Sequence, residues 1–352
     1  MKKIITCAGF HGTGSSVISD LLKEYKNVKS FGEFEFRFLQ DPHGVGSLED
    51  TILRNNCRLN SDRGIYDFLR FIKKISRKKI PFIKKNEYEL FFKNNFEKIS
   101  REYVNNLIDL KWKGWWHDFI FRDRDLFDTI IYRIKRFIFL IYKGINLILG
   151  KKIEGGITET FYYSNKTKEE FIKITKNYLN KLFAAMEVEE ENLCLDQLVP
   201  VVNLEKYLNY FENLKVIVLD RDPRDLYIIN KFIYKDGVVP VENVEIFIQH
   251  FKLLRKDLKK NKDNEEVLRL NFEDCIYNYD KTLKKIVEFL DLNEEDHKDI
   301  KKFFNPEISK NNTQLYLRYP HIKKDIIEIE KQLKEYCYNF PYEIKSKKNK
   351  VF

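Results

Sequence analysis

The sequence predicts an α/β fold, with a short, mostly parallel sheet of about five strands and a large helical insertion. Short apolar runs of strand length alternate with amphipathic stretches of helical period, as in chains whose strands are buried on both faces. The first run ends in a glycine-rich loop, and the last three lie beyond residue 190. The residues between about 48 and 160 are helical in pattern, basic and rich in aromatic side chains.

The chain opens with a strand, a glycine loop and a helix. The apolar run Lys3–Ala8 leads into Gly9–Ser16 (GFHGTGSS), and the helical stretch Val17–Leu22 follows. This order directs backbone N–H groups and the positive end of a helix dipole toward one anion, so it predicts a phosphate cradle and a three-layer, P-loop-like core. Ser15 stands where a lysine would reach a β- or γ-phosphate, which argues against ATP or GTP hydrolysis. The alternative is a strand-to-helix turn whose glycines serve tight packing.

Composition places the chain among globular proteins that favour anionic ligands. Of its 352 residues, 43% are hydrophobic and 34% charged, and the net charge is +10. The charge is spread along the chain, so we expect no nucleic-acid partner. The five cysteines are widely spaced and form no metal-ligand pair, so we expect a reducing compartment and no metal. The first residues lack a signal-peptide pattern, which predicts a cytoplasmic protein.

Charged residues alternate with phenylalanines after the second predicted strand, Val28–Phe31. In open α/β sheets, ligands bind beyond the carboxyl ends of the strands. A carboxylate there, near phosphate and walled by aromatic rings, would have a raised pKa and could accept a proton from a hydroxyl group. Glu33 and Glu35 are therefore candidate bases. The alternative is an ion pair of either residue with Arg37.

The residues from 48 to 160 are predicted to form an insertion on the substrate side of the core or a lid over it. Amphipathic helices are predicted over Ile65–Lys79 and Tyr88–Leu110, and all three tryptophans lie between Trp112 and Trp116. Aromatic faces beside basic residues suit sugar rings, but such clusters also pack into cores. Insertions of this kind commonly choose the substrate.

The most apolar window of the insertion is Leu126–Leu149. It is long enough to cross a bilayer, but charged residues are costly there. The basic residues within it are Arg133, Lys135, Arg136 and Lys143. Two interpretations remain: a buried or substrate-lid helix, which we favour, and a basic amphipathic helix in peripheral contact with an anionic membrane surface.

The last strands carry further polar residues at their ends. The predicted strand Leu193–Gln197 ends in the polar residues Asp196 and Gln197. Asp196 either faces the cleft or caps the next helix. Leu214–Asp220 runs directly into Arg221-Asp-Pro-Arg-Asp225, where Pro and Asp start a helix. Arg221 has the planar fork of donors that suits a phosphate monoester, so we predict a second anion-binding corner. The alternative is an Arg–Asp ion-pair network that stitches the loop.

The lysine-poor glycine loop and the Arg-x-Pro-Arg-Asp unit together resemble the sulfotransferase family, whose donor is 3′-phosphoadenosine 5′-phosphosulfate. Two later segments agree with the resemblance: the strand and helix across 267–290, with the sequence NFED, and the stretch Ser309–Thr313. The resemblance covers residues 3–37 and about 193–315. It implies one sulfotransferase-like α/β domain over 1–352, in which 48–160 is the insertion and 345–352 a basic tail.

The resemblance also implies roles for individual residues. Arg221 would hold the 3′-phosphate, and Glu33 would be the catalytic base, with Glu35 as competitor and Arg37 beyond. The loop residues that would hold the 5′-phosphosulfate are Gly12, Thr13, Gly14, Ser15 and Ser16. The family usually has Lys or Arg where Gly12 stands, and a phosphate-binding Ser where Ile229 stands. Residues that could compensate are His11, which could also stabilise charge in the reaction, Arg224, Asn230 and Lys310.

The implied reaction moves a sulfuryl group to a hydroxyl group, with adenosine 3′,5′-bisphosphate as product and no metal. The aromatic and basic insertion favours a carbohydrate or glycan acceptor. Two alternatives stay open: a metal-dependent P-loop kinase of a small molecule, and a non-catalytic membrane-surface relative. The sequence does not fix the oligomeric state.

Overall fold

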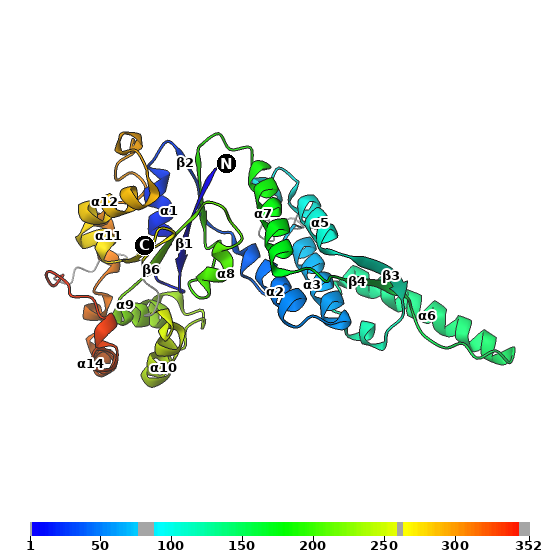
Figure 1. Cartoon of the computed structure of the whole chain (residues 1–352). Coiled ribbons are helices and arrows are strands. Elements are labelled where there is room, and N and C mark those ends of the chain that lie inside the picture. The colour runs from blue at the N-terminus through cyan, green and yellow to red at the C-terminus, as the bar shows by residue number, and fades with distance from the viewer. Residues whose placement is uncertain (1, 77–87, 259–262, 345–352) are drawn as a thin grey trace. The chain divides into compact units, whose positions relative to one another are not determined.

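The computed structural model describes residues 2–76, 88–258 and 263–344, and the chain forms two compact units (Figure 1). The first unit joins Met1–Asp41 to Met186–Phe352, and the second is Pro42–Ala185. The predicted basic tail, 345–352, lies outside the described residues.

The first unit contains the predicted five-stranded parallel sheet. Its strands are β1 (Lys3–Gly9), β2 (Val28–Glu35), β5 (Asn192–Asp196), β6 (Leu214–Asp220) and β7 (Val267–Asn271). They lie in the order β2-β5-β1-β6-β7, and each neighbouring pair is parallel. The predicted α/β class is therefore confirmed. The chain leaves β1 toward one edge of the sheet and leaves β6 toward the other, so the topological switch point, where such sheets bind ligands, lies between these two strands.

Both faces of this sheet are covered. Ile5 and Cys7 of β1 pack into one apolar cluster with helix α1 (Ser16–Lys23) and helix α12 (Tyr279–Leu290). Ile4 and Ala8 point to the opposite face and are buried as well. Both sets of alternating side chains of β1 are therefore buried, and the predicted three-layer core is confirmed.

A second apolar cluster packs around the chain that follows β6. It contains residues of α9 (Pro223–Ile228), α10 (Val244–Arg255) and α14 (Lys323–Gln332), including the fully buried Tyr227. The remaining α-helices of this unit are short: α8 (Leu204–Leu208), α11 (Asp274–Tyr277) and α13 (Pro306–Ser309). The cluster fixes α9, whose first residues adjoin Arg221.

The second unit is helical around a two-stranded antiparallel hairpin, β3 (Leu110–Gly114) with β4 (Glu159–Tyr163). Its helices are α2 (Val45–Glu49), α3 (Arg58–Ser76), α4 (Tyr88–Phe91), α5 (Phe96–Leu107), α6 (Leu126–Ile148) and α7 (Lys168–Ala184). The unit thus extends beyond the expected insertion of 48–160 at both ends. The hairpin was not predicted.

Two predictions in the second unit are wrong. The helix expected over Tyr88–Leu110 is broken, because Lys93 and Asn94 have φ of +51° and +60°, a conformation that no helix contains. The interpretation of α6 as a buried helix fails because none of its residues is buried. Within the described ranges, no helix combines the length and the apolar character needed to span a bilayer.

Candidate functional site

The glycine loop between β1 and α1 is closed by its own hydrogen bonds. The backbone N–H of Thr13 donates to the carbonyl oxygen of Phe10 at 3.1 Å, and the Thr13 hydroxyl donates to the same oxygen at 2.8 Å. Gly12 and Gly14 have φ of +82° and +83°, where L-residues are strained. A Cβ on Gly14 would also lie 2.8 Å from Cδ2 of Phe272. The loop therefore requires glycine at position 14 on two grounds.

The start of α1 presents backbone donors at this loop. Helical bonding begins at Val17, whose N–H donates to the carbonyl oxygen of Gly14. The N–H groups of Gly14, Ser15 and Ser16 come before it, where a helix offers no acceptor and its dipole is positive. Gln197, at the end of β5, donates to Ser15 Oγ at 3.0 Å and so orients that hydroxyl. These donors make the loop an anion cradle.

Arg221 joins the glycine loop at the switch point. Its Nη1 donates to the carbonyl oxygen of Gly12 at 3.2 Å, and its Nη2 donates to that of Asn312. The guanidinium lies 4.4 Å from the centre of the Phe272 ring and is almost fully buried. Burial lowers the pKa of Arg221, which the carboxylate of Asp225 partly opposes. The two predicted anion-binding elements therefore meet in one place.

Three buried polar atoms around this junction have no hydrogen-bond partner among the described residues: Arg221 Nε, Asn230 Oδ1 and Asn312 Oδ1. Asn230 packs against the loop, since its Nδ2 lies 3.2 Å from where a Cβ on Gly12 would be. Buried polar groups are paired in the great majority of cases, and an exception calls for a functional explanation. One donor and two acceptors around a single loop indicate a place where a ligand completes the bonds.

Two buried carboxylates hold the backbone that positions Arg221. Asp225 accepts hydrogen bonds from the N–H groups of Gln314 and Leu315, both at 2.7 Å. Glu273 accepts one from the N–H of Asp222 at 3.0 Å. Burial, and then the Asp222 charge, raise the pKa of Asp225 to about 7 and that of Glu273 to about 8.

Arg224, predicted as a cofactor ligand, is held in an ion-pair network. Its Nη2 lies 2.6 Å from Asp222, its Nη1 lies 2.8 Å from Glu330, and Nη2 also donates to the carbonyl oxygen of Tyr338. The alternative interpretation of this segment predicted such an arrangement, in which an Arg–Asp ion-pair network holds the loop together. A contact with the cofactor stays a prediction.

Two other candidates are also engaged by carboxylates. His11 Nε2 lies 2.9 Å from Asp236 Oδ2. Lys310 Nζ lies 2.8 Å from each carboxylate oxygen of Glu307, and that hydrogen bond raises the pKa of Lys310. Asn312, two residues after Lys310, contacts Arg221 through its backbone carbonyl oxygen.

The predicted bases lie at the end of β2. The side chain of Glu33 is outside the described part of the structure. Glu35 is exposed, and Arg37 Nη1 lies 3.5 Å from its carboxylate. Arg37 Nε donates to Asp41 at 2.8 Å, which fixes the guanidinium beside Glu35. The ion-pair alternative thus describes Glu35.

Asp196 is a stronger carboxylate candidate than the sequence indicated. It pairs in register with Glu35, is only 5% exposed, and its Oδ1 has no partner among the described residues. Burial, and then the Glu35 charge, raise the pKa of Asp196 to about 7. The N-cap position of the helix after β5 is Asn203, so the capping role considered for Asp196 is wrong. A carboxyl group that titrates near neutral pH therefore adjoins Gln197, which contacts the loop.

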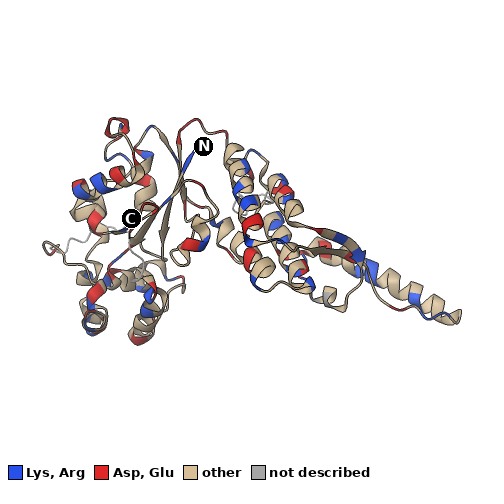
Figure 2. Ribbon diagram, viewed as in Figure 1, with Lys and Arg blue, Asp and Glu red and all other residues tan. Residues whose placement is uncertain are grey.

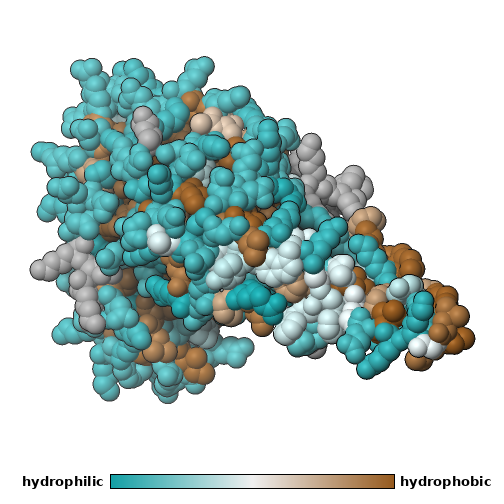
Figure 3. All heavy atoms as spheres, turned by 45° about the vertical axis from the view of Figure 1, so that its right-hand side comes forward, coloured by the Kyte–Doolittle hydropathy of each residue, from teal (hydrophilic) through white to brown (hydrophobic). Residues whose placement is uncertain are grey.

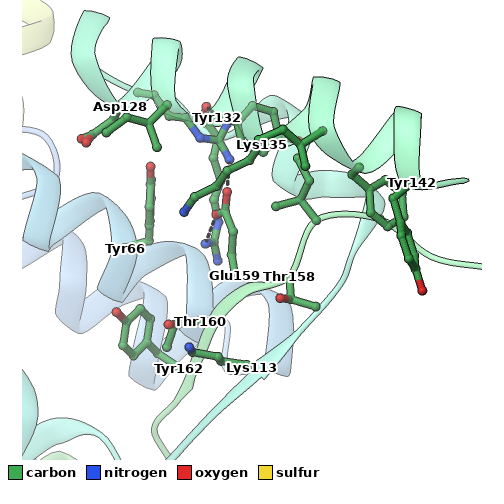
Figure 4. A pocket seen from close by; sticks show the side chains of 17 residues that line it. Tyr66, Lys113, Asp128, Tyr132, Lys135, Tyr142, Thr158, Glu159, Thr160 and Tyr162 are labelled. Carbon is green, nitrogen blue, oxygen red and sulfur yellow. Dashed lines mark hydrogen bonds and ion pairs between the residues drawn. The ribbon is translucent and has the colours of Figure 1, made fainter.

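The second unit contains a pocket of about 970 Å³ lined by the β3–β4 hairpin, α3 and α6 (Figure 4). Its aromatic and cationic lining residues include Tyr66, Lys113, Tyr132, Lys135, Tyr142 and Tyr162. None of the three tryptophans lines it. Trp112 instead stacks on Phe161 at 4.9 Å, as the packing interpretation of that cluster proposed.

Arginines beside this pocket are already neutralised. Arg122, 3% exposed in its side chain, pairs with Asp62 and lies 2.9 Å from Glu159. Arg124 lies 2.5 Å from the other oxygen of Glu159. Lys113 and Lys135 have no ion pair within the described ranges, so they are the cations available to a ligand.

Sequence reasoning missed Gln197 and Asn312 as site residues. Gln197 has a positive φ of +52°, and its N–H bonds to the carbonyl oxygen of Cys7 in the neighbouring strand. Its place directly after a buried strand was a usable signal. Asn312 carries no comparable local signal, because its partner Arg221 lies on a distant segment.

No model of a known protein family matches the chain. No curated protein matches it either. Among solved structures, it is similar to the sulfotransferase domain of the olefin synthase from Synechococcus PCC 7002, with 12% identity, a TM-score of 0.43, and coverage of 96% of this chain and 95% of that chain. For the sulfotransferase domain of the curacin biosynthetic pathway, the identity is 12%, the TM-score 0.42 and the coverage 97% and 99%. Retinol dehydratase, in complex with androsterone and inactive cofactor PAP, is 14% identical with a TM-score of 0.34. The match covers 96% of this chain and 82% of that chain.

Proposed function

We propose that this chain transfers a sulfuryl group from 3′-phosphoadenosine 5′-phosphosulfate to a hydroxyl group of a carbohydrate or glycan. One observation carries the donor assignment: Arg221 and Gly12, 209 positions apart in sequence, are joined by a hydrogen bond of 3.2 Å. A cradle of backbone donors and a buried guanidinium thus form one site. A nucleotide with anionic groups at both its 3′ and 5′ positions offers an anion to each.

The residues present fit such a nucleotide. The N–H groups at positions 14–16 and the hydroxyls of Ser15 and Ser16 would hold the 5′-phosphosulfate. Arg221, through its unpaired Nε, would hold the 3′-phosphate. The free amide oxygens of Asn230 and Asn312 would accept hydrogen bonds from the nucleoside. When bound, the cofactor supplies the sulfuryl group and an anionic leaving group.

The chain itself supplies a base and charge stabilisation. Asp196, whose pKa is raised to about 7, would accept the proton of the acceptor hydroxyl at Oδ1. Glu33 is the alternative base. Donors of the loop stabilise developing negative charge, and each such donor contributes roughly 3 kcal/mol in known enzymes. Glu35, oriented by Arg37, tunes Asp196, and His11 stays at the loop through its pair with Asp236.

The acceptor assignment is separate and rests on the pocket of the second unit. Tyrosine rings offer flat apolar faces with a polar edge, which suit sugar rings. Lys113 and Lys135 would attract anionic groups on the sugar. We therefore expect oligosaccharides with carboxylate or sulfate groups to bind better than neutral ones.

Calorimetric titration with adenosine 3′,5′-bisphosphate, beside ADP, tests the donor site. We expect the bisphosphate to bind at least about 100-fold more tightly than ADP, because charge-assisted hydrogen bonds to a second phosphate are strong. The Arg221→Ala variant should lose that preference. Arg101→Ala, which changes an exposed arginine of the second unit, is the matched control.

Arg221 also bonds two backbone carbonyls, so its variant is first checked for folding by circular dichroism. A folded Arg221→Ala protein that keeps the preference would refute the donor assignment. Equal affinity for ADP and the bisphosphate in the unchanged protein would refute it too, and Mg²⁺-dependent ATP turnover would then favour the kinase alternative.

A further inference from the structure

Helix α6 (Leu126–Ile148) presents an apolar strip to solvent. Large apolar side chains recur along it at spacings of three and four residues: Phe127, Ile130, Ile134, Phe137, Ile141, Ile145 and Ile148. Their exposure runs from 47% at Ile141 to 86% at Ile148. At 3.6 residues per turn these positions lie on one side of the helix. Apolar side chains gather on the surface of this helix (Figure 3).

The strip is distinct from the side of α6 that faces the pocket. Tyr132, Lys135 and Tyr142 point from α6 toward the hairpin and line the pocket (Figure 4). None of the seven residues of the strip lines the pocket. The strip therefore does not serve the pocket, and an exposed apolar surface of this length marks an interaction site.

Positive charge accompanies the strip (Figure 2). The basic residues of α6 are Arg133, Lys135, Arg136 and Lys143. Asp128 is the single acidic residue of the helix, and Lys73 Nζ lies 2.8 Å from its carboxylate. The helix thus carries an excess of positive charge beside its apolar side chains.

We propose that α6 docks this protein on an anionic membrane surface. The apolar strip would enter the boundary between head groups and acyl chains, while the basic residues bind lipid phosphates. A second copy of the chain is a poorer occupant, because two α6 helices packed through their strips would bring like charges together. The proposal is independent of the sulfuryl-transfer reaction and would hold for a protein without that activity.

Vesicle co-sedimentation of the full chain tests the proposal. We expect the apparent partition coefficient to be at least about tenfold higher on phosphatidylcholine vesicles that contain phosphatidylglycerol than on phosphatidylcholine alone, and to fall at high salt. The double variant Ile134→Asp with Ile141→Asp should lose binding. Both side chains are about half exposed, so the fold should tolerate the change.

Two further variants separate the contributions. Replacing Arg133, Arg136 and Lys143 by Gln should abolish the preference for anionic vesicles. Ile327→Asp, which adds one such charge at an exposed isoleucine of α14, is the control and should bind as the unchanged protein does.

Two results would overturn the proposal. One is binding that does not depend on lipid charge, or that survives the double variant. The other is a dimer in sedimentation velocity that the double variant dissociates while vesicles bind neither protein, which would assign the strip to a second copy of the chain.

Discussion

The polar groups around the glycine loop of the first unit and those beside the pocket of the second unit are satisfied to different degrees. Around the glycine loop of the first unit, Arg221 Nε, Asn312 Oδ1 and Asp196 Oδ1 are buried without partners among the described residues. Beside the pocket of the second unit, Arg122 and Arg124 are paired with Asp62 and Glu159. A satisfied ion-pair network stabilises its own fold, whereas unpaired polar groups are kept at a cost in stability. We therefore expect a ligand at the glycine loop, whereas the arginines beside the pocket are held by the protein itself.

In the pocket of the second unit, the arginines and the lysines have different roles. Arg122 and Arg124 stack on aromatic rings, with Arg124 only 3.8 Å from the ring centre of Tyr132. Their planar groups are thus used for structure. Lys113 and Lys135 are flexible point charges, and they are left for a ligand. A cation count alone would have assigned all four to binding.

The largest expected effect is on catalysis in the first unit. Asp196→Asn should lower kcat by about 10² to 10⁴, because a positioned base typically contributes that much. The unfolding temperature should not fall, since the change removes a carboxyl group that is costly to ionise when buried. Release of adenosine 3′,5′-bisphosphate, measured with a panel of oligosaccharide acceptors, reports the activity.

Glu35→Gln is the matched control for Asp196. Removing the Glu35 charge should lower the pKa of Asp196, so the acidic limb of the kcat/KM profile should move to lower pH with a modest loss of rate. Full activity in Asp196→Asn together with loss of activity in Glu33→Gln would move the base to Glu33.

A stability effect of about 3–5 kcal/mol is expected in the second unit from Arg122→Ala, because it leaves the Asp62 carboxylate buried and unpaired. All three tryptophans lie in this unit, so their fluorescence in a denaturant titration reports its unfolding selectively. Arg70→Ala, which removes an exposed partner of Asp123, should shift the midpoint far less. Equal shifts in the two variants would show that the buried network contributes no more than a surface pair.

The sheet was predictable from sequence because its signal is local. The strands β1, β5 and β6 are largely buried, so each reads as an apolar run that is bounded by short glycine or polar segments. The hairpin carries no such signal. None of the residues of Leu110–Gly114 is buried, and its partner Glu159–Tyr163 follows only after the whole of α6. The sequence of one strand therefore does not indicate that it pairs with a segment far away in the chain.

The site was predictable only as far as its motifs extend. The glycine loop and Arg221 were identified because each directly follows a buried strand. Arg221 and Arg224 look alike in the sequence RDPRD, yet only Arg221 contacts the loop. Arg224 is drawn away by Glu330 and Tyr338, which lie more than a hundred positions later. Asp222 of the motif also holds Arg224, so the roles of the two arginines are decided only in part by residues that the local motif does not contain.

The last expected effect, on the order of a few kcal/mol and confined to high pH, comes from Glu273→Gln in the first unit. Burial and the Asp222 charge raise the pKa of Glu273 from its usual 4.5 to about 8 in the folded chain. Between these two values the unfolded chain releases the proton and the folded chain keeps it. Stability therefore falls as the pH rises from about 4.5 to 8, and the full penalty remains above that range.

Glutamine keeps an oxygen to accept the Asp222 N–H but has no proton to lose. Thermal unfolding of Glu273→Gln and the unchanged protein should therefore coincide near the acid end of that range, and the variant should be the more stable one above pH 8. A variant that is less stable at high pH would mean that the Glu273 charge supports Arg221 more than burial opposes it. The buried carboxylates of the first unit would then resemble the closed network of the second, and the contrast between the units would fail.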